Sequence, residues 1–154
     1  MLRVVIASLH LIALGLGMGA VLTRGNTLRE PVTTPSLRRA FKADNLWAAA
    51  ALLWIATGLW RLLGGLEKPT AYYLANHLFF MKMALFVLIL VLESWPMLTL
   101  IRWRLALRRA EMPESFAHPA TARRIAMLSH IEALLLVLMV FAAAAMARGY
   151  GLAG

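Results

Sequence analysis

The chain has 154 residues, of which 62% are hydrophobic and 15% are charged, and its formal net charge is +9. This composition is too apolar for an ordinary soluble domain and is typical of a membrane domain with several spans. The absence of cysteine excludes disulfides, thiolate metal sites and iron–sulfur clusters. The basic residues lie between apolar runs and not along a polar face, so we expect them to set membrane orientation and not to bind nucleic acid.

Four apolar runs follow one another along the chain, at residues 4–22, 46–63, 76–101 and 125–146. Each is close to the roughly 20 residues that a helix needs to cross a bilayer. A signal peptide is the alternative interpretation of the first run, but the basic segment that follows it resists translocation. The sequence therefore predicts an all-α polytopic four-helix bundle, with residues 1–154 forming one transmembrane domain.

Small residues mark the first run, where Gly15 and Gly19 form a GxxxG step with Gly17 between them. Such a step lets a neighbouring helix, or a flat cofactor, approach the backbone closely, and helix packing is the preferred interpretation. Pro31 and Pro35 indicate a loop in the segment 24–44, and a helix start is predicted at Ser36.

The third run carries two ionisable residues, Lys82 and Glu93, inside its apolar stretch. Eleven residues correspond to three helical turns plus roughly 20°, so both lie on one face, about 16 Å apart along the axis. Charged groups inside a span are costly when they face lipid. We therefore expect this face to meet other helices, a cofactor or water.

Membrane orientation follows from the distribution of basic residues. Eleven of them lie in the first and third connections, against four on the opposite side. The positive-inside rule then places both basic connections in the cytoplasm and both termini outside, in a bacterial inner membrane. The eleven residues are Arg24, Arg29, Arg38, Arg39, Lys42, Arg102, Arg104, Arg108, Arg109, Arg123 and Arg124; the four are Arg3, Arg61, Lys68 and Arg148.

A polar cluster is predicted near the outer face. His10 lies roughly 9 Å down the first helix, and Lys82 lies at a comparable depth in the third. Around them we place Arg61, Lys68, Tyr72, Tyr73, Asn76 and His77. Imidazole from His10 or His77 can ligate haem iron, with Met81 or Met83 as a sulfur partner. Arg61, Lys68 or Lys82 can pair with propionates, so the cluster suits a tetrapyrrole or another flat anionic ligand.

An inner cluster of Glu93, His130 and Glu132 is also possible, for proton relay or a divalent ion. His130 and Glu132 are about 200° apart on their helix, so they cannot both face one site. Solvation at the helix end is the preferred interpretation for that pair. Glu93 lies deeper and is kept as a candidate for a proton route.

Several stretches carry a resemblance to a known family: ASLHLIALGLGMGA in the first run, the segment from DNLW to IRWR, and SHIE at the start of the last run. With them the chain resembles an uncharacterised bacterial family of four-span predicted membrane proteins. More distantly it is similar to membrane protoporphyrinogen oxidases of the HemJ type and to the membrane part of copper-resistance protein D. In the HemJ type a first-helix His and a third-helix Lys are functional and b-type haem is bound. By position, these residues match His10 and Lys82.

The leading hypothesis is a b-haem protein for electron transfer or oxidation of a porphyrinogen-type donor. His10 is the expected axial ligand, Lys82 an anion or proton partner, and Glu93 a proton route. One alternative is a copper or solute transporter that uses His10, His77 and methionines as ligands. Another is a structural membrane subunit. The expected partners are the lipid bilayer and either a second copy of the chain or a membrane redox protein.

Overall fold

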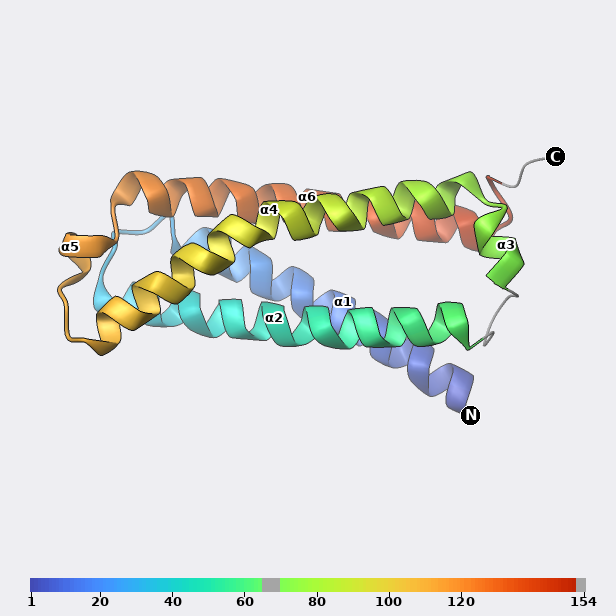
Figure 1. Cartoon of the computed structure of the whole chain (residues 1–154), viewed down its shortest axis with the longest axis horizontal. Helices are drawn as coiled ribbons and strands as arrows, with labels where there is room; N and C mark the ends of the chain where they lie inside the picture. The colour runs from blue at the N-terminus through green and yellow to red at the C-terminus, as the bar shows by residue number, and fades with distance from the viewer. Residues whose placement is uncertain (65–69, 152–154) are drawn as a thin grey trace.

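The computed structural model describes residues 1–64 and 70–151. Four long helices make up most of this part of the chain, and each is long and apolar enough to cross a membrane (Figure 1). No strand is found in the described residues, which confirms the predicted all-α membrane architecture. The long helices are α1 (Leu2–Thr27), α2 (Thr34–Leu63), α4 (His77–Arg108) and α6 (Pro119–Ala147), with two short helices, α3 (Thr70–Leu74) and α5 (Pro113–Phe116), between them.

The long helices extend beyond the predicted spans. The second helix begins at Thr34, two residues before the helix start predicted at Ser36 and twelve before the apolar run at 46–63, and α4 runs on to Arg108 and not to residue 101. The apolar runs mark only the lipid-facing length, whereas a helix continues until a cap or a turn ends it. At the start of α2, the backbone N–H of Ser36 donates to the Thr33 hydroxyl, and the N–H of Thr33 donates to the Ser36 hydroxyl.

The helices pack as two pairs. α1 lies mainly against α2 and α6, and α4 lies mainly against α6. The start of α1, the end of α6 and the short helix α3 are at one end of the molecule, while α5 is at the other (Figure 1). This arrangement agrees with four crossings, and the outward orientation of this end stays a prediction from the basic residues. Lys68, which we placed in the outer polar cluster, lies outside the described residues.

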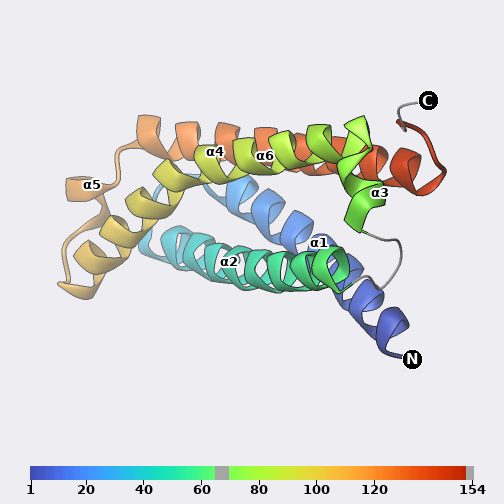
Figure 2. The same ribbon diagram turned by 45° about the vertical axis from the view of Figure 1, so that its right-hand side comes forward.

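The two ends of the bundle differ in packing. Near α5, buried apolar side chains fill the space between the helices, among them Phe41, Leu100, Trp103 and Ile125. Toward α3, the ribbons of α1 and α2 diverge from those of α4 and α6 (Figures 1 and 2). α4 changes direction along the segment that contains Pro96, because proline removes a backbone hydrogen bond of the helix (Figure 1).

Gly17, and not its two glycine neighbours, provides the close approach between α1 and α2. A Cβ atom at Gly17 would lie 2.9 Å from Cζ3 of Trp47. At Gly15 and Gly19 no described atom of a neighbouring element lies within 4 Å of such a Cβ. The prediction that these two receive a neighbouring helix or a cofactor is therefore wrong within this chain, because both face outward.

Candidate functional site

A cavity of about 620 Å³ lies between the four long helices, in the half of the bundle that carries α3. This volume is within the range of roughly 300–1,000 Å³ that small-molecule and cofactor sites occupy. Small residues leave the space open at Gly58, Ala143 and Ala144. The apolar part of its wall combines aliphatic side chains, such as Leu14 and Leu59, with aromatic and sulfur-containing ones, among them Trp54, Phe86 and Met139.

Three basic side chains predicted to lie near one another are on the wall of this one cavity. His10 comes from α1, Arg61 from α2 and Lys82 from α4. α1 packs mainly against α2 and α6 and not against α4. His10 of α1 and Lys82 of α4 therefore line the same cavity although their helices are not closely packed. Tyr72 also lines the cavity, and its hydroxyl donates to the carbonyl of Met146 at 3.0 Å, which ties α3 to α6.

His10 is held in one ring orientation. Its Nδ1 lies 2.9 Å from the hydroxyl oxygen of Thr57, and that hydroxyl donates its single hydrogen to the carbonyl of Leu53 at 2.7 Å. Thr57 must then accept from Nδ1–H, so the neutral ring carries its lone pair on Nε2. The ring stacks on Trp54, with centroids 5.4 Å apart. A Cβ atom at Gly58 would lie 3.2 Å from its Cε1.

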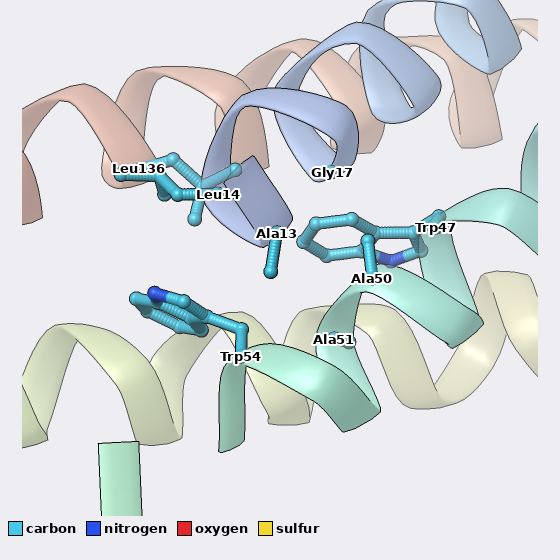
Figure 3. A pocket seen from close by; sticks show the side chains of 8 residues that line it. All are labelled: Ala13, Leu14, Gly17, Trp47, Ala50, Ala51, Trp54 and Leu136. Atoms are coloured by element: carbon cyan, nitrogen blue, oxygen red, sulfur yellow. The ribbon is translucent and has the colours of Figure 1, made fainter. Parts of the chain in front are cut away.

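Trp54 adds an unpaired donor to the same wall. Its indole nitrogen is buried and has no hydrogen-bond acceptor among the described residues. Trp54 also borders a second, small cavity of about 10 Å³ (Figure 3), where this nitrogen lies on the ring edge turned toward Leu14 and Leu136. Buried indole N–H groups usually have a partner. The arrangement therefore favours a ligand or a water molecule with an acceptor near Trp54.

Two predicted ligands lie elsewhere. His77 is exposed at the start of α4, and Met81 is 47% exposed; neither lines the cavity. Consecutive residues of a helix point about 100° apart, so Met81 cannot share the direction of Lys82. Within the described part of the chain, no group of three or more His, Asp or Glu side chains is arranged to hold a metal ion. The copper alternative stays an untested prediction.

A second polar centre, which we call the Arg24 cluster, joins all four long helices at the other end of the bundle. Arg24 of α1 is fully buried. Its Nη1 and Nη2 donate to the two carboxylate oxygens of Glu93, at 2.7 Å each. Nη1 also donates to Asp44 of α2 at 3.0 Å, and Nη2 to Glu132 of α6 at 2.8 Å. The other members are Ser129, which accepts from Nε at 3.0 Å, and Arg104, which lies 3.3 Å from Asp44.

This cluster corrects two predictions. Arg24 was expected in a cytoplasmic loop, but α1 continues to Thr27 and turns it inward. Glu132 was expected to be solvated, but it is 0% exposed because α6 begins at Pro119, well before the predicted position. Glu93, predicted as a proton route, is paired with Arg24.

His130 points away from the acids of the Arg24 cluster. Its ring nitrogens lie 2.6 Å from the carbonyl of Ala126 and 3.1 Å from the side-chain oxygen of Asn26. This agrees with its predicted angular separation from Glu132. The signal that sequence reasoning missed is a seven-residue spacing: His10, Gly17 and Arg24 are all buried on the inner face of α1.

The chain belongs to a family described as predicted membrane protein (DUF2214), whose model matches residues 2–151. This confirms the resemblance to an uncharacterised family of predicted membrane proteins. No curated protein and no solved structure matches the chain. The more distant similarity to HemJ-type oxidases and to copper-resistance protein D therefore stays a prediction.

Proposed function

We propose that this member of the DUF2214 family binds b-type haem in the cavity between α1, α2, α4 and α6, in a bacterial inner membrane. The hydrogen bond from His10 to Thr57 is the observation that carries the proposal. It makes Nδ1 the donor in a ring on the cavity wall, which is the tautomer in which Nε2 is the metal-binding nitrogen. Histidines that ligate metals almost always donate their other N–H to a fixed acceptor, as His10 does here.

The remaining walls suit the rest of such a ligand. Arg61 and Lys82 carry the positive charge that pairs with carboxylates, while aromatic rings and methionines provide an apolar surface for a macrocycle. Gly58 lets the His10 ring lie close to the backbone of α2, and the alanines of α6 leave room for a flat group in the cavity. The buried N–H of Trp54 offers a further donor.

The cavity residues would then divide the work of binding. When bound, haem would supply one-electron redox chemistry. His10 would hold the iron, Arg61 and Lys82 would orient the carboxylates, and the apolar wall would limit the entry of water. Electron transfer with a membrane partner, or oxidation of a porphyrinogen-type donor, is the reaction class that we propose.

Titration with haemin tests the proposal on the full chain purified in detergent. We expect the wild type to give a saturable Soret shift at one haem per chain. His10→Ala removes the iron ligand and should abolish this shift, whereas His77→Ala, at an exposed position, should retain it. Unsaturable haemin uptake by the wild type would refute haem binding. An unchanged spectrum for His10→Ala would refute the ligand assignment.

A further inference from the structure

The Arg24 cluster contains one acidic group more than it has basic groups. Arg24 and Arg104 are the two guanidinium groups, and Asp44, Glu93 and Glu132 are the three carboxyl groups. These residues come from every helix packed at this site, and the neighbouring His130 makes its hydrogen bonds elsewhere. If all five were ionised, a buried site would hold an uncompensated negative charge, which is costly inside a membrane.

Hydrogen-bond geometry distinguishes the three carboxyl groups. Both oxygens of Glu93 accept from Arg24. Both oxygens of Asp44 face guanidinium nitrogens, one of Arg24 and one of Arg104. Glu132 differs, because Oε2 shares one nitrogen of Arg24 with Glu93, whereas Oε1 is buried with no partner among the described residues.

The adjacent hydroxyl does not supply the missing hydrogen. Ser129 accepts from Nε of Arg24 at 3.0 Å and donates its hydrogen to the carbonyl of Ile125 at 3.0 Å. Oε1 of Glu132 therefore has no donor from Ser129. A buried carboxylate oxygen that is ionised and has no hydrogen-bond donor is energetically costly. A proton bound to this oxygen removes the charge of the carboxylate.

We propose that Glu132 is a proton-binding site, with an exchangeable proton on Oε1 that makes the Arg24 cluster electrically neutral. Loss of the proton leaves two ionised carboxylates, Glu93 and Glu132, on one nitrogen of Arg24. Met139, on the cavity wall, follows Glu132 by seven residues of α6, about 10 Å along the helix. The assignment does not depend on which ligand the cavity binds.

Infrared spectroscopy of the full chain in lipid vesicles at neutral pH tests the proton. We expect the C=O stretching band of a protonated carboxylic acid, which moves to lower frequency in D₂O and also when glutamate is labelled with ¹³C. The band should be lost in Glu132→Gln and kept in Glu114→Gln, an exposed carboxyl in the connection to α6. No such band in the wild type, or a band that glutamate labelling does not move, would overturn the proposal.

Thermal unfolding identifies the residue that holds the proton. Glutamine resembles a neutral glutamic acid, so Glu132→Gln should leave the melting temperature unchanged. Glu93→Gln replaces an ionised group that accepts two hydrogen bonds from Arg24, and should lower the melting temperature by several degrees. The reverse order would overturn the assignment to Glu132. The isotope shift needs no variant, so the presence of a protonated glutamate is tested even if a variant fails to fold.

Discussion

Every N–H of the Arg24 side chain has an acceptor. A guanidinium group offers five such hydrogens, and the structure gives it five hydrogen bonds, to Ser129, Asp44, Glu93 and Glu132. The acceptors come from α2, α4 and α6, so one side chain of α1 connects the whole bundle. Lysine, with three donors on a single nitrogen, cannot reproduce this arrangement.

Replacing Arg24 should therefore be strongly destabilising. Arg24→Gln leaves buried carboxylates without their counter-charge, and removing one partner of a buried ion pair typically costs about 3–5 kcal/mol. Unfolding of the full chain in mixed detergent micelles measures the loss. Arg29→Gln is the matched control, because Arg29 is exposed just beyond the end of α1. Equal stability of the two variants would contradict the role of Arg24.

Thr57 should control haem affinity without touching haem. Thr57→Val removes the acceptor of His10 Nδ1–H but keeps the size of the side chain. Loss of such an outer partner typically lowers metal affinity by about 10–100-fold. Haemin titration measures the change, and an unchanged melting temperature of the variant serves as its control. Wild-type affinity in Thr57→Val would show that this hydrogen bond does not position a ligand.

Among the helices, α1 shows most clearly how one face can carry several functions. His10, Gly17 and Arg24 follow one another at seven residues, so they bring the cavity wall, the closest contact with α2 and the Arg24 cluster onto one side. About 21 Å of helix separates His10 from Arg24. The two polar centres are thus held apart by the apolar packing around Gly17.

Gly17 should tolerate less change than its glycine neighbours. Gly17→Ala places a Cβ atom 2.9 Å from the Trp47 ring, and overpacking of this kind typically costs about 1–3 kcal/mol. Gly15→Ala meets no described atom of another element within 4 Å, so it should be neutral or slightly stabilising. Unfolding in mixed micelles compares the two. A larger loss at Gly15 would show that the outward face of α1 is covered by a partner in the membrane.

The sequence was sufficient for the spans because hydropathy reports lipid contact directly. It was insufficient for the helix ends, since α2 begins at Thr34, directly after the cap Thr33 and twelve residues before its predicted apolar run. Because the helix ends were placed at the limits of the apolar runs, Arg24 and Asp44 were assigned to a loop. The ion pair between them was therefore not predicted. Position along the sequence alone suggests that polar residues at the end of a span are solvated. Their angular position around the helix shows that they face inward.

At the scale of the whole molecule, the bundle is closed by the Arg24 cluster and its apolar core at one end and opens around the cavity at the other. Comparison of depths in the first and third spans, which run in the same direction, was enough to bring His10 and Lys82 to one cavity, with Arg61 from the second span. It was not enough to exclude His77 and Met81, whose depth is right but whose direction is wrong. The proton site at Glu132 depends on individual hydrogen bonds, which no spacing rule predicts.

Filling the cavity should remove ligand binding and leave the fold intact. Ala143→Phe adds a ring to the wall formed by α6 and should prevent saturable haemin binding. Ala84→Phe on α4 is the control, since Ala84 is exposed and does not line the cavity. Circular dichroism should show the same helix content in both variants. Retained binding by Ala143→Phe would place the ligand elsewhere.

Whether the protein carries haem in the membrane is decided by its absorption spectrum after purification from haem-replete cells, without added haemin. We expect a Soret band and a pyridine haemochrome of b-type haem, at one haem per chain in the wild type and near zero in His10→Ala. A wild-type protein that is folded and helical but shows no Soret band would contradict it.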